Sequence, residues 1–196
     1  GGGSGIGLAC VEALLGAGAI VGVVDTFLDE IPSGCEGLKT DVTNLAAVNA
    51  QIQAFGEAHG RIDVLVSNAG ISFVGGIESG AEDDWSRVFD VNVFGQFRVI
   101  RAALPWLRRS SHASIVVMSS CTAFNGIPDR VLYSASKGAV QAMAMALSSD
   151  LVGEGIRVNC VAPGTVDTPF IKKIIASAEN PAALRASYQA RQPNNL

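Results

Sequence analysis

Apolar residues fall along the chain in short runs that alternate with longer stretches of helical periodicity. Four runs rich in Val and Ile predict strands buried on both faces, at residues 19–24, 62–66, 115–118 and 156–161. Helices are predicted over residues 44–59, closed by Gly60; over residues 83 to about 107, with Pro105 near the end; and over residues 131–151, stopped by Gly153 and Gly155. This alternation predicts an α/β fold: a doubly wound parallel sheet with helices on both faces.

The composition is that of a single domain over residues 1–196. Of the 196 residues, 48% are hydrophobic and 16% are charged, which supports a substantial core. The net charge is −4 and no run of lysine and arginine occurs, so neither nucleic acid nor an anionic membrane is an expected partner. No stretch is long and apolar enough to span a membrane, and no signal peptide is visible.

The cysteines favour a reducing compartment. Cys10, Cys35, Cys121 and Cys160 are scattered without a CxxC pair or a metal-type spacing. We therefore expect free thiols, no metal site and a cytoplasmic location.

The first seven residues form a glycine-rich segment before a helix. Gly1-Gly2-Gly3-Ser4-Gly5-Ile6-Gly7 opens onto the amphipathic residues 8–15. Such glycines let the backbone approach a pyrophosphate, which then lies on the unpaired N–H groups of the helix N-terminus. The next apolar run ends at Asp25, whose carboxylate would accept hydrogen bonds from ribose hydroxyls and repel a 2′-phosphate. No lysine or arginine lies in the glycine segment or beside Asp25. NAD is therefore expected rather than NADP; an N-capping or surface Asp25 is the alternative.

A tyrosine and a lysine four residues apart carry the candidate chemistry. Tyr133 and Lys137 fall on one face of the predicted helix. Because an ammonium favours a neighbouring phenolate, Lys137 is expected to lower the pKa of Tyr133, so that the phenol acts as acid or base near neutral pH. Ser120 follows a predicted strand, from which its hydroxyl can meet the same substrate oxygen. The alternative is an exposed tyrosine paired by chance with a surface lysine.

Taken in order, these motifs resemble those of the short-chain dehydrogenase/reductase family over nearly the whole chain. The glycine motif of that family, TGxxxGxG, matches from Gly1 through Gly5 and Gly7, without the preceding threonine. The other matches are Asp41-Val42-Thr43, Asn68-Ala69-Gly70, Asn92, Ser120, Tyr133, Lys137, Pro163-Gly164 and Thr168. The resemblance implies a Rossmann fold, hydride transfer between nicotinamide and a carbinol carbon, and assembly as a homotetramer.

The resemblance also implies a role for each matched residue. Tyr133 is the acid or base, Lys137 additionally holds the nicotinamide ribose, and Ser120 hydrogen-bonds the substrate oxygen. Asn92 holds a water that links Lys137 to solvent; a buried asparagine bonded to helix backbone is the alternative. The residues expected to contact the cofactor are Gly1, Ser4, Gly5, Ile6, Gly7, Asp25, Asp41, Val42, Asn68, Ala69, Gly70, Tyr133, Lys137, Pro163, Gly164, Val166 and Thr168.

The substrate is expected to be a secondary alcohol or ketone. Between Asp25 and Asp41 there is no room for the usual helix. Together with residues 163–169, Asn180-Pro181 and Arg191-Gln192, this resembles a subgroup of NAD-dependent dehydrogenases of 3-hydroxybutyrate, sugars and sugar acids. Arg130, three residues before Tyr133, would hold a substrate carboxylate bidentately, and Arg191 would add a second contact. For both arginines the alternative is a solvated surface side chain.

Two other functions fit the same fold. One is an NADPH-dependent reductase of the 3-oxoacyl type, which Asp25 disfavours. The other is a non-catalytic dinucleotide-binding protein, which the presence of Ser120, Tyr133 and Lys137 disfavours.

The family pattern also extends past both ends of this sequence. In the family, a central strand precedes the glycine motif, and a helix and a strand follow the region of residues 191–193. The chain is therefore expected to be a fragment that lacks the first strand and the last helix and strand.

Overall fold

The computed structural model describes residues 1–191, and residues 192–196, including Gln192 of the subgroup pattern, lie outside the described part. The strands are β1 (Val21–Asp25), β2 (Cys35–Lys39), β3 (Val64–Ser67), β4 (Ser114–Met118) and β5 (Arg157–Val161). The helices are α1 (Gly5–Gly16), α2 (Leu45–His59), α3 (Glu82–Phe89), α4 (Gly95–Leu107), α5 (Val131–Leu151), α6 (Pro169–Ala176) and α7 (Pro181–Ala190).

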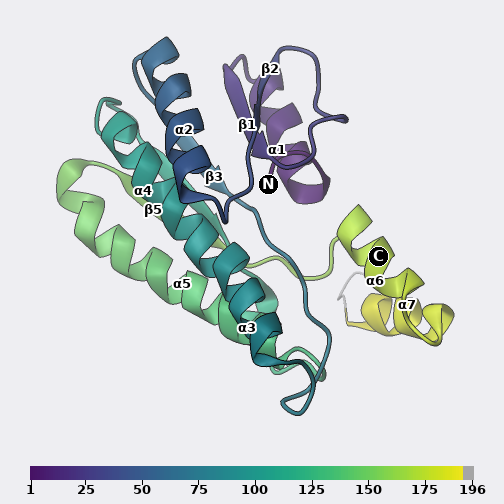
Figure 1. The fold of residues 1–196 in the computed structure, drawn as a ribbon. Helices are drawn as coiled ribbons and strands as arrows, with labels where there is room; N and C mark the ends of the chain where they lie inside the picture. The colour runs from purple at the N-terminus through teal and green to yellow at the C-terminus, as the bar shows by residue number, and fades with distance from the viewer. Residues whose placement is uncertain (192–196) are drawn as a thin grey trace.

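The strand pairs within residues 1–191 are all parallel, as the alternation of strands and helices predicts. β1 pairs with β2, while β3, β4 and β5 form a second sheet in that order. Helices α2, α4 and α5 lie over the larger sheet, and α1 packs on β1 (Figure 1). This Rossmann-like α/β arrangement confirms the predicted fold class.

The prediction that the strands are buried on both faces is right for β4 and wrong for its neighbours. Ile115 and Val117 of β4 are fully buried, whereas Val64 of β3 is 44% exposed and Val161 of β5 is 45% exposed. β4 is paired on both sides, but β3 and β5 are the outer strands of their sheet. β2 is not among the predicted apolar runs because its five residues include Glu36 and Lys39.

The helix ends follow the sequence signals. Asn44 caps α2 by accepting a hydrogen bond of 3.0 Å from the N–H of Ala47, and Gly60 ends the helix with a left-handed φ of 78°. The long helix predicted from residue 83 is α3 and α4 joined by one π-helical turn, Asp90–Phe94. As predicted, residues 26–34 contain no helix.

Two hydrophobic clusters stabilise the two sheets. The larger is formed by α2, α4, α5 and the strands β4 and β5, and the smaller by Val11, Val21 and Val23 of α1 and β1. Helices α6 and α7 lie beside this body at the C-terminal end of the described chain (Figure 1). None of the helices within residues 1–191 has the length and apolar character needed to cross a membrane.

Candidate active site

A pocket of about 470 Å³ lies beyond the carboxyl ends of the strands. In open parallel sheets, this edge is where ligands bind. Nearly all of the predicted site residues line it: Gly1, Ser4, Gly5, Ile6, Asp25, Asp41, Val42, Asn68, Ala69, Gly70, Ser120, Arg130, Tyr133, Lys137, Pro163, Gly164, Val166, Thr168 and Arg191. The fold therefore brings together residues spread over almost the whole sequence.

Gly7 does not line the pocket, and its contact with the cofactor stays a prediction. A Cβ at Gly7 would lie 1.8 Å from the carbonyl oxygen of Gly1, and one at Gly1 would lie 2.3 Å from the backbone nitrogen of Ala69. Both positions require glycine because backbone segments approach each other closely there. Gly7 thus packs the glycine segment together, while Gly1, Ser4, Gly5 and Ile6 face the pocket.

The N-terminus of α1 opens into the pocket. Its N-cap, Ser4, makes no side-chain capping hydrogen bond to the described chain, which leaves the first N–H groups of α1 available to a ligand. Unpaired N–H groups and the positive end of the helix dipole favour a phosphate group. The close-packed glycines and this open helix end fit the pyrophosphate of a dinucleotide.

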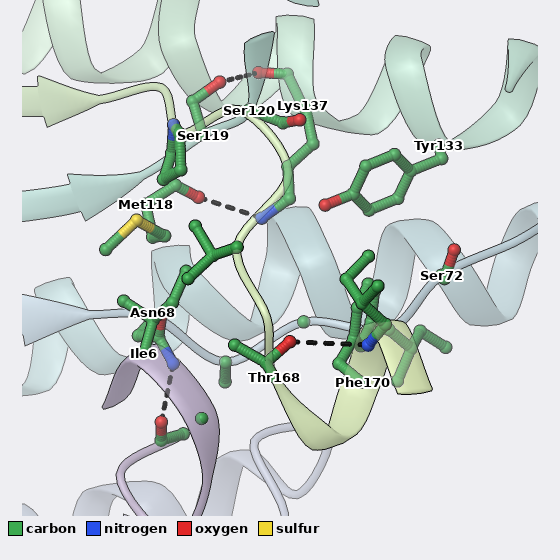
Figure 2. Close-up of a pocket in the computed structure, with 18 of the residues that line it drawn as sticks. Ile6, Asn68, Ser72, Met118, Ser119, Ser120, Tyr133, Lys137, Thr168 and Phe170 are labelled. Atoms are coloured by element: carbon green, nitrogen blue, oxygen red, sulfur yellow. Dashed lines mark hydrogen bonds between the residues drawn. The ribbon is translucent and has the colours of Figure 1, made fainter. Parts of the chain in front are cut away.

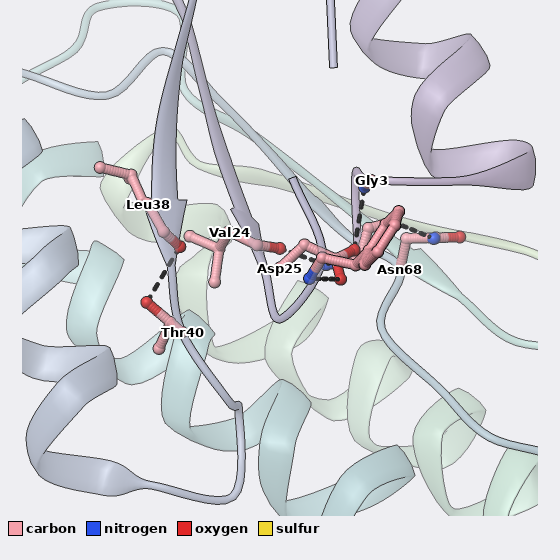
Figure 3. A network of polar contacts seen from close by, with 8 residues as sticks. Gly3, Val24, Asp25, Leu38, Thr40 and Asn68 are labelled. Carbon is pink, nitrogen blue, oxygen red and sulfur yellow. Dashed lines mark hydrogen bonds and ion pairs between the residues drawn. The ribbon is translucent and has the colours of Figure 1, made fainter. Parts of the chain in front are cut away.

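Asp25 lies at the end of β1, beside the glycine segment (Figure 3). Its Oδ2 accepts a hydrogen bond of 2.9 Å from the N–H of Gly3, and its Oδ1 accepts one of 3.1 Å from the N–H of Phe27. Burial alone would raise the pKa of Asp25, but the hydrogen bonds from the N–H groups of Gly3 and Phe27 lower it by favouring the ionised form. Asp25 is therefore ionised at neutral pH and is not an N-cap.

Asp41 accepts two hydrogen bonds at Oδ1, from the N–H and the hydroxyl of Thr43, at 2.9 and 2.8 Å. Asp41 stabilises its own turn at the pocket wall. Lys39 is in register with Asp25 on the neighbouring strand, but it does not line the pocket.

Asn92 is completely buried and does not reach the pocket. Its Oδ1 accepts a hydrogen bond of 2.7 Å from the N–H of Ile71, and its Nδ2 donates to the Ile71 carbonyl and to Ser136 Oγ, both at 3.0 Å. The side chain therefore holds the loop after Asn68-Ala69-Gly70. This matches the buried-asparagine alternative, with a loop in place of helix backbone, and the predicted water relay stays a prediction.

Ser120, Tyr133 and Lys137 meet at the centre of the pocket (Figure 2). Ser120 follows the end of β4, and α5 carries the other two side chains on one face. Lys137 is 3% exposed, and its Nζ donates a hydrogen bond of 2.9 Å to the Met118 carbonyl. Ser119 Oγ donates one of 2.9 Å to the Lys137 carbonyl, which is a second hydrogen bond between α5 and the end of β4. Burial lowers the pKa of Lys137 to about 8.

The expected lowering of the Tyr133 pKa is wrong for this structure. Burial raises the pKa of Tyr133 above its ordinary value, and the hydrogen bond with Ser120 and the charge of Arg130 offset this only in part. Lys137 Nζ lies 5.8 Å from the centroid of the Tyr133 ring and is bonded to Met118. The phenol is therefore protonated at neutral pH in the free protein.

Arg130 lines the pocket and is the N-cap residue of α5, directly before Val131. Its Nη1 donates hydrogen bonds of 3.3 Å to Ser72 Oγ and to the Phe73 carbonyl, and its Nη2 donates one of 2.5 Å to the hydroxyl of Tyr188 on α7. Arg130 is thus not a solvated surface arginine. Arg191 lies over the ring of Tyr188, 5.3 Å from its centroid, and is exposed.

Several residues around Arg130 in the pocket are not among those predicted from the sequence. Ser72, Ile127, Phe170, Ile174 and Tyr188 line it, and the Phe170 ring lies 6.5 Å from that of Tyr133. Tyr188 is 6% exposed and is the one aromatic residue of α7, which is the feature of the sequence that could have marked it. No pattern in the sequence marks Ser72.

Comparisons with known proteins agree with this site. The family model described as short chain dehydrogenase matches residues 1–179. The 2-(S)-hydroxypropyl-CoM dehydrogenase 3 of Xanthobacter autotrophicus is 32% identical over 203 residues, which covers 98% of this chain and 80% of that protein. The 3-oxoacyl-[acyl-carrier-protein] reductase FabG of Thermotoga maritima is 35% identical over 192 residues, which covers 93% of this chain and 78% of that protein.

Two solved structures also superpose closely on this chain. The ligand-free aldohexose dehydrogenase of Thermoplasma acidophilum superposes with a TM-score of 0.91 at 32% identity, covering all of this chain and 78% of that one. ElxO with NADP bound superposes with a TM-score of 0.89 at 28% identity, covering all of this chain and 82% of that one. The chain belongs to the short-chain dehydrogenase family, the oxidoreductases that bind a nicotinamide dinucleotide and act on CH–OH groups.

Proposed function

We propose that the protein is an NAD-dependent dehydrogenase that oxidises the secondary alcohol of a hydroxy acid. The observation that carries this proposal is the position of Arg130 in the same pocket as Ser120 and Tyr133. A guanidinium binds a carboxylate bidentately, and a substrate held there by its acid group presents its hydroxyl to the catalytic residues.

The choice of NAD rests on Asp25. Its ionised carboxylate would accept hydrogen bonds from ribose hydroxyls and repel the 2′-phosphate of NADP. The basic side chains that line the pocket within residues 1–191 are Arg130, Lys137 and Arg191, and none of them is among the described hydrogen-bond or ion-pair partners of Asp25. The runner-up function, an NADPH-dependent ketone reductase, would need a positive group at the Asp25 end.

The residues of the pocket divide the chemistry among them. Bound NAD supplies the hydride acceptor. In alcohol oxidation Tyr133 removes the hydroxyl proton, and the Ser120 hydroxyl donates a hydrogen bond to the substrate oxygen as charge develops there. Because the pKa of Tyr133 is raised, oxidation should become faster as the pH rises, whereas the protonated phenol favours ketone reduction. Lys137, an ammonium at neutral pH, would stabilise the phenolate and hold the nicotinamide ribose.

Three finer assignments stay predictions. They are the water held near Asn92, the homotetramer and the cytoplasmic location. Each follows from family resemblance or composition.

A substrate comparison on the whole protein tests the proposal. With NAD, 3-hydroxybutyrate should be oxidised at least about 100-fold more efficiently, as kcat/KM, than its neutral amide, because the amide cannot pair with Arg130. Replacing NAD by NADP should lower kcat/KM about tenfold or more. Equal use of acid and amide would contradict the carboxylate anchor, and a preference for NADP would favour the reductase. NAD binding without turnover on any secondary alcohol would favour a non-catalytic protein.

A further inference from the structure

The hydrogen-bond donors of Arg130 are divided between the protein and the pocket. A guanidinium carries five N–H groups, one on Nε and two on each of Nη1 and Nη2. Nη1 donates to Ser72 Oγ and to the Phe73 carbonyl, both at 3.3 Å, and Nη2 donates to the Tyr188 hydroxyl at 2.5 Å. These are the hydrogen bonds described for the guanidinium within residues 1–191, so the N–H of Nε and the second N–H of Nη2 remain for a ligand.

The two remaining N–H groups match a carboxylate. Nε and Nη2 lie along one edge of the planar guanidinium, and a carboxylate binds such an edge through two parallel hydrogen bonds. A carboxylate can therefore bind while Ser72, Phe73 and Tyr188 keep their hydrogen bonds to Arg130. A neutral amide has one acceptor oxygen in place of two, so it cannot form this pair.

Tyr188 is the partner that holds Arg130 most firmly. Its hydrogen bond is the shortest of the three, and Tyr188 is only 6% exposed, so packing fixes the ring that carries the hydroxyl. An arginine side chain that is mobile loses conformational freedom when it binds a ligand, whereas one that is held beforehand has already lost it. A guanidinium held both by the segment after β3 and by α7 should therefore bind a carboxylate more tightly than a mobile one.

We propose that Tyr188 is a positioning residue, whose hydroxyl holds Arg130 so that the Nε–Nη2 edge of the guanidinium receives the carboxylate of the substrate. Tyr188 then acts on acids through Arg130 and not by touching the substrate. Ser72 supports the same guanidinium more weakly, because its bond is longer and Nη1 also donates to the Phe73 carbonyl. This inference rests on the proposed function, which takes Arg130 as the carboxylate anchor.

Butyrate and its neutral isostere butyramide test the positioning without turnover, because neither carries the reacting hydroxyl. In calorimetric titration of the whole protein at saturating NAD, Tyr188→Phe should bind butyrate about tenfold more weakly than the parent, since the ring stays and only the hydroxyl is lost. The affinity for butyramide should change by less than about twofold, which also shows that the variant is folded. Gln189→Ala, at an exposed position of α7 outside the pocket, is the control and should behave like the parent.

Two variants of Arg130 separate positioning from a general effect on the pocket. In an Arg130→Met background, Tyr188→Phe should leave the affinity for butyrate unchanged, because no guanidinium remains to be positioned. Arg130→Lys keeps the positive charge but lacks the edge of two nitrogens, so it should bind butyrate about tenfold more weakly than the parent. An affinity in Arg130→Lys equal to that of the parent would show that this edge does not bind the carboxylate, and would overturn the proposal.

The outcomes distinguish this inference from the proposed function. If Arg130→Met loses butyrate binding but Tyr188→Phe binds butyrate as the parent does, or more tightly, the positioning role is wrong and the carboxylate anchor stands. An equal loss of butyrate and butyramide binding in Tyr188→Phe would also overturn the inference, since the hydroxyl would then shape the whole pocket. If the parent binds butyrate no more tightly than butyramide, the carboxylate anchor fails and the positioning role fails with it.

Discussion

The two ends of α5 are held in different ways. At the catalytic centre, Lys137 donates to a backbone carbonyl of β4, and Ser119 returns a hydrogen bond to the α5 backbone, so two central elements fix each other. At the first turn, Arg130 is held by the Ser72 side chain, by a loop carbonyl and by Tyr188 of the peripheral helix α7.

This difference predicts which substitutions should change turnover and which should change the preference for a substrate. At Lys137 both hydrogen bonds end on backbone carbonyls, which no substitution removes. Two acceptors of Arg130, the hydroxyls of Ser72 and Tyr188, are side chains that a single substitution can remove. We therefore expect substitutions at the centre to lower turnover on every substrate. Substitutions at Arg130 or Tyr188 should change the affinity for acids.

The largest effect is expected at Tyr133. Tyr133→Phe removes the group that moves the substrate proton, and kcat should fall about 10³-fold on acids and neutral alcohols alike. Binding of NAD, measured by calorimetry, should stay within about twofold of the parent. Turnover close to that of the parent would remove Tyr133 from the mechanism.

Substitution of Arg130 should weaken the binding of acids and should not lower turnover on every substrate. Arg130→Met keeps much of the side-chain length but loses the guanidinium, so KM for 3-hydroxybutyrate should rise about 100-fold. The kcat/KM for a neutral alcohol should fall far less, through the loss of the charge that lowers the pKa of Tyr133. The matched control is Arg185→Met, an exposed arginine of α7 outside the pocket, which should behave like the parent. A loss of kcat on all substrates would place Arg130 with the catalytic group instead.

A smaller change is expected from Asp25→Asn, which removes the charge and keeps a side-chain acceptor for the N–H of Gly3. The ratio of kcat/KM for NAD to that for NADP should fall about tenfold, because the 2′-phosphate is no longer repelled. Asp29→Asn, an exposed acid farther along the same loop, is the control and should leave the ratio unchanged. An unchanged ratio in Asp25→Asn would mean that cofactor choice does not depend on this carboxylate.

The smallest effect concerns stability. Burial lowers the pKa of Lys137 from 10.5 to about 8, so the folded protein binds fewer protons than the unfolded chain between these values. The resulting destabilisation is fully present below pH 8 and is lost as the pH rises toward 10.5. Lys137→Met should therefore raise the free energy of unfolding at pH 7, and the gain should shrink by about 1 kcal/mol at pH 9.

Urea unfolding at the two pH values measures this difference. Lys173→Met, which removes an exposed lysine, should show no such pH-dependent gain. A gain in Lys137→Met that is the same at both pH values would show that the buried ammonium is not its source.

Much of the fold followed from local signals. Asn44 and Gly60 mark the ends of α2, and the β4 run and the spacing of Tyr133 and Lys137 predicted the elements that bring these two residues and Ser120 into one pocket. The exposed faces of β3 and β5 could not be predicted in this way, because apolar runs do not say which strand lies at the edge of a sheet. The π-helical turn at Asn92 also carries no local pattern, since it accompanies side-chain bonds to Ile71 and Ser136 from distant segments.

The sequence by itself determined the order of strands and helices, the family, and the identity of the residues that meet beyond the strand ends. These depend on local periodicity, capping and motif order, which need only neighbouring residues. Only the tertiary structure decided that burial raises the pKa of Tyr133 and lowers that of Lys137, and that Arg130 is held by Tyr188. Those properties arise from desolvation and from contacts between residues far apart in the chain, and neither is encoded in any short segment.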